Sequence, residues 1–364
     1  MSVKEKVIIF GGTFDPIHFG HLKMAEYAKS EIKPDRFIWL PTGTNPFKKG
    51  KKITTSEHRL KMLKMAIDKN DEISEFETNR RTISYTKDSI KYFKSIYPNA
   101  DIYFLIGSDL LTRLHKWEEI QWISEQVTLL VARRSSRISK VNLKKYNARL
   151  LNNEVVEFSS TDVKHGIYDL VPNNVQKYFA KNYLYLEEYL RKCLSVKRSK
   201  HSFATAEFAG QLAKDNGLEW NTSYYAGLLH DVAKEWENDV HRELINKYYD
   251  IKFENLETHK YHQISGALWY KYIYKGENEK IYKAILNHTT LENTPLSIED
   301  KIVFIADKIS EGRKFNGIQK LRNLVKSDLE NGFKSLLKIN LNFLKEKNVA
   351  SEKIIAHYER LING

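Results

Sequence analysis

The chain has 364 residues, of which 41% are hydrophobic and 12% aromatic, and a formal net charge of +13. One hydrophobic core rarely grows beyond about 250–300 residues, so we expect two domains, and no apolar run is long enough to cross a membrane. The only dense basic runs, Lys48–Lys52 and Arg133–Arg137, are short and lack interleaved aromatic residues, so the charge favours scattered lysines and nucleotide sites over a nucleic-acid partner.

The start of the chain and its cysteine content both favour a cytoplasmic protein. Residues 1–12 run from a charged start directly into a short strand, without the apolar stretch and small-residue cleavage site of a signal peptide. Cys193 is the single cysteine, so no internal disulfide can form.

The first half of the chain alternates β-type runs with amphipathic stretches. The expected strands are residues 7–10, 37–40, 102–106, 127–132 and 155–158, and the expected helices include residues 22–30, 57–68 and 86–96. This alternation predicts an α/β fold with a parallel sheet that helices cover on both faces. Ligands of such sheets bind beyond the carboxyl ends of the strands.

The first expected strand runs into the segment GGTFDPIHFGH at residues 11–21. Gly11 and Gly12 allow the backbone to approach a ligand closely. A helix that begins soon afterwards would direct its free N–H groups at the same space, with His18 and His21 on one face. Two imidazoles beside a helix N-terminus suit the phosphates of a nucleoside triphosphate. Neither a G-x-G-x-x-G motif nor a P-loop motif occurs.

This segment resembles the signature of the nucleotidyltransferase superfamily, and its T-F-D-P-x-H-x-G-H form is similar to bacterial nicotinate-nucleotide adenylyltransferases. Further segments resemble that family in the same order: Asn45–Lys48, Arg80–Thr86 with Asp88, Ile106–Asp109 with Trp117, Val131–Arg133 and Ser159–Thr161. The resemblance implies a Rossmann-like nucleotidyltransferase domain over residues 1–185.

The resemblance also implies a mechanism. The phosphate of nicotinate mononucleotide attacks the α-phosphorus of ATP in line and pyrophosphate leaves, with no protein nucleophile. His18 and His21 are the implied catalytic residues, and Mg²⁺ arrives with ATP. The implied substrate-binding residues are Gly11, Gly12, Thr13, Phe14, Lys48, Thr86, Gly107, Asp109, Trp117, Arg133, Ser159, Ser160 and Thr161. Among them, Thr86 and Trp117 would form the pyridine pocket, and Lys48, Arg133 and the Ser160-Thr161 turn would contact phosphate.

The sequence departs from the family pattern at three places. Phe47 stands where many relatives have histidine, Thr82-Ile83 replaces a Gly-Pro pair, and Lys164 replaces an arginine in a shortened segment. Lysine cannot bind phosphate as a bidentate guanidinium does, which would weaken ATP binding. An active transferase is the leading interpretation, and the alternative is a degenerate nucleotide-sensing module that regulates the second half.

From about residue 186 the strand signals vanish and longer helical periods follow, which predicts an all-α domain over residues 186–364. The expected helices are residues 201–216, 223–235, 261–273, 280–287, 298–311 and 317–344. The join near residues 185–192 has no flexible linker. Beyond about residue 326 no motif is recognised, so packing or contacts in a homo-oligomer are the default expectation.

Several histidines and aspartates of this half occur on apolar helices. Asp307 follows an apolar run, where a carboxylate is costly unless it is paired or bound to a metal. His230-Asp231 lies in a similar apolar helix. The candidate metal ligands are His201, His230, Asp231, His262, His288 and Asp307. Imidazole and carboxylate suit iron, manganese or zinc, and the lack of cysteine ligands argues against a structural zinc site. We expect His241, His259 and His357 to be ordinary core or surface residues.

The order H…HD…H…H…D resembles the HD-domain phosphohydrolases. The local sequences are similar to bacterial HD proteins that hydrolyse diadenosine tetraphosphate symmetrically: Arg198-x-x-His201, Leu229–Lys234, Ala284–Thr290 and Ile305–Arg313. The resemblance implies a helical bundle with two divalent metals, iron before manganese or zinc, that release ADP. Asp231 would bridge the metals, with Lys234 and Arg313 stabilising charge. The alternative is another nucleotide or phosphate ester as substrate.

Overall fold

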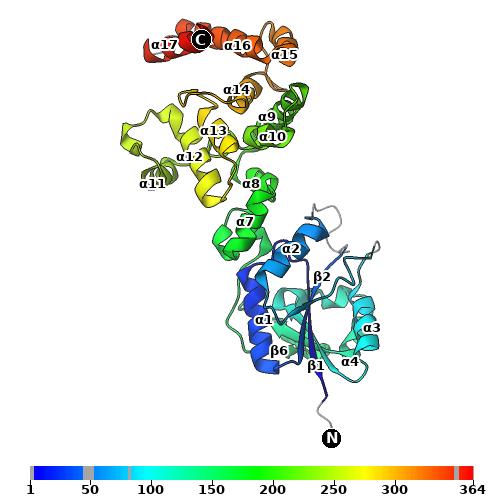
Figure 1. The fold of residues 1–364 in the computed structure, drawn as a ribbon. Helices are drawn as coiled ribbons and strands as arrows, with labels where there is room; N and C mark the ends of the chain where they lie inside the picture. The colour runs from blue at the N-terminus through cyan, green and yellow to red at the C-terminus, as the bar shows by residue number, and fades with distance from the viewer. Residues whose placement is uncertain (1–3, 44–52, 81–82, 348–351, 364) are drawn as a thin grey trace. The chain divides into compact units, whose positions relative to one another are not determined.

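The computed structural model describes residues 4–43, 53–80, 83–347 and 352–363. The chain divides into two compact units, residues 1–179 and residues 180–364. The first contains a sheet with helices and the second is helical in its described residues (Figure 1). This confirms the predicted fold class, an α/β domain followed by an all-α domain. In the described parts of both units, no helix is long and apolar enough to cross a bilayer.

The sheet of the first unit has six parallel strands in the order β3-β2-β1-β4-β5-β6. Their bounds are β1 Lys6–Gly12, β2 Arg36–Pro41, β3 Glu72–Ile73, β4 Asp101–Gly107, β5 Thr128–Ala132 and β6 Arg149–Leu150. The strand order reverses between β1 and β4, as in doubly wound sheets. A ligand crevice is expected where these two neighbouring strands end.

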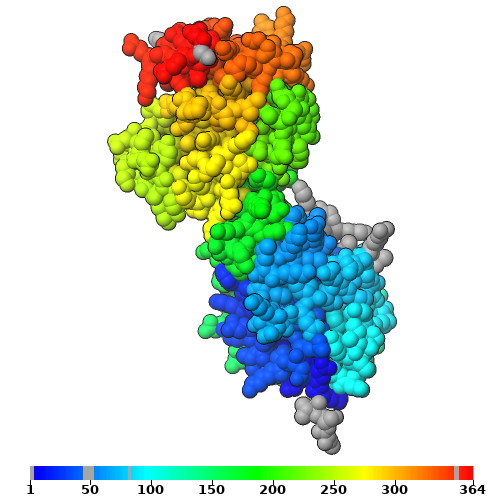
Figure 2. All heavy atoms as spheres, in the orientation of Figure 1, coloured from blue at the N-terminus to red at the C-terminus, as the bar shows by residue number. Residues whose placement is uncertain are grey.

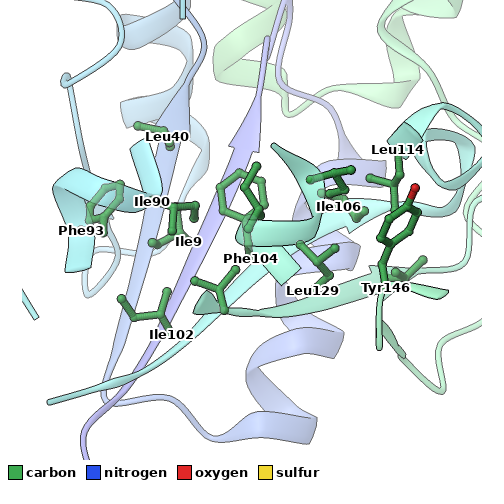
Figure 3. Close-up of a cluster of buried hydrophobic side chains, with 14 of the residues drawn as sticks. Ile9, Leu40, Ile90, Phe93, Ile102, Phe104, Ile106, Leu114, Leu129 and Tyr146 are labelled. Carbon is green, nitrogen blue, oxygen red and sulfur yellow. The ribbon is translucent and has the colours of Figure 1, made fainter. Parts of the chain in front are cut away.

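The helices that begin in this unit are α1 Phe19–Ile32, α2 Ser56–Ala66, α3 Thr86–Ile96, α4 Ile120–Gln126, α5 Lys140–Lys145, α6 Ser160–Lys164 and α7 Asn173–Lys181, with 3₁₀ turns at Ser108–Lys116 and Tyr168–Leu170. The strands are apolar because both of their faces are covered. Figure 3 shows one core, in which Ile9 and Phe104 of the sheet face Ile90 and Phe93 of α3. This packing fixes the strand ends that carry the glycine turn.

One expected strand is wrong, because residues 155–158 form no strand. Instead, the side chain of Asn153 forms hydrogen bonds with the backbone N–H and carbonyl groups of Arg133, which a neighbouring strand would otherwise bind. It accepts a hydrogen bond from the Arg133 N–H at 2.8 Å and donates one to the Arg133 carbonyl at 3.1 Å. Only the Val156 N–H adds a backbone bond to that carbonyl, at 3.1 Å. The sequence also missed β3 and β6, which have two residues each and are too short to show periodicity.

The second unit consists of helices in its described residues. They are α8 Leu186–Cys193, α9 Val196–Asp215, α10 Trp220–Leu229, α11 Asn238–Tyr248, α12 Tyr261–Leu268 with a π-helical extension Trp269–Ile273, α13 Glu279–Asn287, α14 Ile298–Ile309, α15 Ile318–Ser327, α16 Leu329–Glu346 and α17 Glu352–Asn363, with 3₁₀ turns at Phe253–Asn255 and Thr258–Lys260. Most of α14 is fully buried, and apolar residues lie all around it, as expected of a central helix.

The prediction of a single helix over residues 317–344 is also wrong, since the helix is interrupted at Asp328, between α15 and α16. Asp328 has extended backbone there, and its carboxylate accepts a hydrogen bond from the Asn331 N–H at 3.0 Å, which caps α16. The helices after the break pack against α14, for example through an edge-to-face contact of Phe333 with Phe304. In Figure 2 the orange and red atoms of this C-terminal segment lie directly against the gold atoms that precede it.

Candidate active sites

A cavity of about 680 Å³ lies at the carboxyl ends of β1 and β4 in the first unit. Its size is typical of a small-molecule site. Most of the residues that the sequence predicts for this site line the cavity: Gly11, Gly12, Thr13, Phe14, His18, His21, Thr86, Gly107, Asp109, Trp117, Ser159, Ser160 and Thr161. Lys48 lies outside the described residues.

The end of β1, at Gly11 and Gly12, needs glycine because aromatic rings pack closely against it. A Cβ atom at Gly12 would lie 2.7 Å from the ring of Phe14. Phe14 is itself buried and has a φ of +50°, a strained value for a residue with a side chain. Its ring contacts His21 edge to face, with ring centroids 5.0 Å apart. The buried aromatic therefore holds the turn and one of the two histidines together.

The two histidines lie against each other at the start of α1, which begins directly after His18. Their ring centroids are 3.7 Å apart, and the His18 N–H donates to Nδ1 of His21 at 3.3 Å. A neutral His21 therefore carries its proton on Nε2. A Cβ atom at Gly20 would lie 2.8 Å from the His18 ring. Glycine at position 20 thus leaves the space that this ring occupies.

His18 is 1% exposed. Burial and the nearby guanidinium of Arg134 lower the pKa of His18 to about 3. The ring is therefore neutral at physiological pH and can offer an anion one N–H group, rather than a full positive charge.

Arg133, which the sequence predicts as a phosphate contact, does not line the cavity; its neighbour Arg134 does. The Arg133 side chain donates from Nε to the Leu151 carbonyl at 3.2 Å. Arg134 donates from Nη2 to the Phe158 carbonyl at 2.7 Å and lies 3.3 Å from Asp109. Successive side chains of an extended segment point to opposite sides, so a motif that ends at one arginine does not show which arginine faces the ligand.

Lys164, which replaces the family's arginine, pairs with a carboxylate in this structure. Its Nζ lies 2.7 Å from Oδ2 of Asp15, and Asp15 is 5% exposed. Ser160 donates to the Pro16 carbonyl at 3.0 Å, and Ser159 caps α6 by accepting from the Asp162 N–H. These contacts hold the short helix α6 against the Asp15-Pro16 turn. Lys164 itself does not line the cavity, and it stabilises the position of Ser160 and Thr161, which do.

Glu77 lines the cavity although the sequence analysis did not select it. It is 6% exposed and accepts a hydrogen bond from the Ser89 hydroxyl at 2.7 Å. Burial raises the pKa of its carboxyl group. Glu77 stands three residues before Arg80 in a matched segment, and Arg80 pairs with Asp88 at 3.1 Å. No feature of the sequence alone separates Glu77 from the other acidic residues around it.

The six predicted metal ligands of the second unit converge in two groups of three. One group is His201, His230 and Asp307, and the other is Asp231, His262 and His288. In each group the ligand atoms lie within 4.8 Å of one another. Three of the six follow the ends of helices rather than lying within them: His230 and Asp231 come directly after α10, and His288 directly after α13. The expectation of an apolar helix that carries the His230-Asp231 pair is therefore corrected.

Two of the histidines are oriented by the helices that precede them. Nδ1 of His230 donates to the Gly227 carbonyl at 2.6 Å, and Nδ1 of His288 donates to the Ile285 carbonyl at 2.7 Å. Each carbonyl lies three residues earlier, in the last turn of its helix. With the proton held on Nδ1, the Nε2 lone pair is directed at the carboxylates, as in metal-binding histidines.

The surroundings of His230 Nε2 fit a cation. Among the described residues, no group forms a hydrogen bond with this fully buried atom, which lies 3.5 Å from Asp231 Oδ2 and 3.6 Å from Asp307 Oδ1. Burial opposes the charged ring, but the two carboxylates outweigh burial and raise the pKa of His230 to about 10. Positive charge is therefore needed between Nε2 and the two carboxylate oxygens, either as a proton on this ring or as a metal ion that takes the place of that proton. The donor set, imidazoles with carboxylates, suits divalent transition metals.

Asp231 reaches both groups of ligands. Its Oδ2 lies near His230, while its Oδ1 lies 3.5 Å from Nε2 of His262 and 3.6 Å from Nε2 of His288. Burial and the charges of neighbouring groups lower the pKa of His262 to about 2. Neutral imidazole is the form that binds metals, and Asp231 has one carboxylate oxygen near each of the two groups.

Four basic side chains surround the two carboxylates. Lys234 lies 3.9 Å from Asp231 and Arg313 lies 3.0 Å from Asp307, and both were predicted. Arg198 and Lys308 were not selected as site residues, although both stand in the matched segments. Their contacts are Arg198 Nη1 to Asp231 Oδ2 and Lys308 Nζ to Asp307 Oδ2, each at 2.7 Å. The signal that could have found Arg198 is its position three residues before His201, on the same face of α9.

Other histidines of this unit make local contacts. His241 Nδ1 lies 2.8 Å from the Ser265 hydroxyl, and His357 Nε2 lies 3.0 Å from the Leu291 carbonyl. His259 lies 3.8 Å from Glu257 at the surface. None of the three belongs to a ligand group found among the described residues.

The comparisons with known proteins agree with the division of the chain into two units, since one family model matches within each. Residues 9–166 match the model of the Cytidylyltransferase-like family, and residues 198–312 match that of the HD domain. A probable nicotinate-nucleotide adenylyltransferase/Ap4A hydrolase of Mycoplasma genitalium is 33% identical over 356 residues, which cover 94% of this chain and 100% of that protein. A protein of the same description from Mycoplasma pneumoniae is 30% identical over 91% of this chain and 98% of its own. A probable nicotinate-nucleotide adenylyltransferase of Clostridium tetani is 35% identical over 50% of this chain and 99% of its own.

Proposed function

Since the chain belongs to the family of the mycoplasma nicotinate-nucleotide adenylyltransferase/Ap4A hydrolases, we propose that it carries both activities. The first unit transfers the adenylyl group of ATP to nicotinate mononucleotide, which gives nicotinate adenine dinucleotide and pyrophosphate. The second unit hydrolyses diadenosine tetraphosphate (Ap4A) to ADP. The observation that carries the second activity is the convergence of six ligands in two adjoining groups. A cytoplasmic location remains a prediction.

In the transferase site we assign phosphate binding to the turn after β1 and to the two histidines. The phosphate of the mononucleotide is the nucleophile, so the protein has to position it and stabilise charge. His18 is neutral and rigidly packed, and we expect it to donate one N–H to the ATP phosphates as charge develops on them. Mg²⁺ that arrives with ATP would neutralise phosphate charge.

Arg134 takes the phosphate-binding role that we expected of Arg133, because Arg134 lines the cavity. Thr86 and Trp117 form the pyridine pocket in this proposal, whereas the phosphate contact expected of Lys48 lies outside the described residues. Lys164 contributes through Asp15 rather than by binding phosphate. An intact turn, two packed histidines and a fastened α6 favour an active enzyme over the degenerate sensing module.

In the hydrolase site we assign one metal to His201, His230 and Asp307, and the other to Asp231, His262 and His288. Asp231 has one oxygen near each group and would be shared between the two metals, and iron is the first expectation, before manganese or zinc. Two divalent metals would lower the pKa of a bound water and clamp phosphate oxygens. The chain itself holds the imidazole Nε2 atoms toward the metals through the carbonyls of Gly227 and Ile285. Lys234 and Arg313 stabilise charge on the departing phosphate.

The test is a substrate panel on the purified protein. Pyrophosphate release from ATP plus nicotinate mononucleotide tests the first unit, and no release at saturating substrate from folded protein would favour the sensing module. ADP release from Ap4A tests the second unit. If Ap4A stays intact while another nucleotide or phosphate ester is cleaved, the hydrolase remains but its substrate assignment is wrong.

A further inference from the structure

The basic residues around the metal ligands of the second unit form two pairs of similar composition. On one side, Lys234 Nζ lies 3.0 Å from Nε2 of His262 and near Asp231, while Arg198 contacts the other oxygen of that carboxylate. Lys234 therefore contacts a histidine and the aspartate, and Arg198 contacts the aspartate alone, through the oxygen that also lies near His230.

The second pair repeats this pattern at the other carboxylate. Arg313 Nη2 lies 3.2 Å from Nε2 of His201 and 3.0 Å from Asp307 Oδ1. Lys308 contacts Asp307 Oδ2. Each group of ligands thus has one basic residue that contacts both histidine and aspartate, and one that contacts aspartate alone.

Burial separates the ligands from these basic residues. The side chains of the six ligands are 0–15% exposed, whereas those of the four basic residues are 25–45% exposed. The four basic residues therefore form a half-exposed rim around a buried centre. They also outnumber the two carboxylates that they contact, so the rim has positive charge in excess before any metal is bound. Such a rim suits a substrate with several phosphates.

We propose that the two pairs hold the phosphate chain on both sides of the bond that is broken, and that this grip sets cleavage at the middle of Ap4A. The inference rests on the proposed hydrolase activity. Ap4A has two phosphates on each side of its central bridging oxygen, and the rim has two basic residues beside each ligand group. The oxygen of a water attacks one of the two central phosphorus atoms, and the bond from that phosphorus to the bridging oxygen breaks. The bridging oxygen leaves on one ADP, and the other ADP keeps the oxygen of the water, whose protons pass to solvent.

The experiment replaces one basic residue of each pair, and uses Arg198→Met and Lys308→Met because these two contact carboxylates but no histidine. We expect either change to lower kcat/KM for Ap4A by about tenfold or more, the usual effect of losing a charge-assisted hydrogen bond. We also expect AMP and ATP to appear beside ADP, because a phosphate chain held on one side can shift by one phosphate. The metal content should stay that of the wild type, and the conservative variants Arg198→Lys and Lys308→Arg should restore ADP as the main product.

Lys301→Met is the matched control. Lys301 lies on the same helix, α14, pairs with Glu330 and sits over the ring of Phe333, much as Lys308 sits over Phe304. It contacts none of the ligands, so it should behave as the wild type. Variants that keep wild-type efficiency and release only ADP would overturn the inference while leaving the hydrolase proposal intact, and so would variants that lose metal in proportion to activity. A wild-type protein that does not cleave Ap4A would exclude both the proposed Ap4A hydrolase activity and this inference.

Discussion

The two candidate sites of this chain are built in opposite ways. In the first unit, one short segment, residues 11–21, supplies the glycine turn, both histidines and the start of α1. In the second unit, the candidate ligands are spread from His201 to Asp307 and come from different helices or from the residues directly after them. The first site depends on local backbone conformation, whereas the second depends on the packing of a whole bundle around α14.

The electrostatics differ in the same way. The first site keeps His18 neutral by burying it, and its partner ring His21 accepts a hydrogen bond from the backbone. The second site places two carboxylates in an apolar interior, where negative charge is costly unless cations compensate it. The paired histidines of the first site therefore need no added charge to stay in place, while the two carboxylates of the second site need positive charge beside them.

The largest effect should come from removing a carboxylate of the second site. Asp307→Ala takes away one ligand and leaves Lys308 and Arg313 without their shared partner. We expect ADP release from Ap4A to fall below detection, while pyrophosphate release by the first unit stays at the wild-type rate. Loss of both activities would show that the two sites are coupled, and would break the comparison.

The converse change acts on the first site alone. We expect His18→Ala to lower kcat for adenylyl transfer by about 100–1000-fold, the usual cost of removing a donor that stabilises developing charge. Ap4A hydrolysis, measured on the same sample, should not change. A transferase rate within a few fold of the wild type would remove His18 from the phosphate site.

A subtler change tests the packing of the paired rings. Gly20→Ala places a methyl group where the His18 ring lies, so the ring must shift. We expect a loss of roughly 1–3 kcal/mol of stability and a lower kcat, with hydrolysis unaffected. Lys23→Ala on the same helix serves as a control for helix changes in general. Equal activity in Gly20→Ala and wild type would show that the ring position is not critical.

The smallest effect concerns pH. The pKa of His18 is about 3 in the folded protein and near 6.5 when unfolded, so the unfolded state binds the extra proton first. The stability that neutral His18 contributes is fully present above pH 6.5 and is lost progressively as the pH falls toward 3. Between pH 7 and pH 5 we expect the wild type to lose about 2 kcal/mol more than His18→Gln in denaturant titrations of the first unit. Parallel losses in the two proteins would contradict the buried, neutral state of this ring.

Much of both sites could be predicted because sequence spacing carries the information. The helix Thr86–Ile96 has the predicted bounds, and the turn after β1 follows from two glycines beside an apolar strand. The six dispersed candidate ligands could be selected because carboxylate and imidazole side chains are conspicuous in apolar helices and directly after them. The direction in which the arginine side chains point could not be predicted. Nothing in the sequence shows that Arg134, rather than Arg133, faces the cavity, because hydrogen bonds of Arg133 with Asn153 and Leu151, which are distant in sequence, set its orientation.

Other features were missed because they depend on tertiary contacts. Glu77 becomes a cavity residue through its contact with Ser89 and through burial that no periodicity indicates. Arg198 and Lys308 become rim residues only when α9 and α14 bring them to the two carboxylates. The break at Asp328 is a capping contact inside a stretch whose apolar pattern continues on both sides.

If the second unit gathers six ligands around cations, elemental analysis of the purified protein should detect those cations. Protein prepared without chelators should contain about two divalent transition-metal ions per chain, and Asp307→Ala should contain fewer. A wild-type protein that is folded, binds no metal even when iron, manganese or zinc is supplied, and still hydrolyses Ap4A would contradict the account.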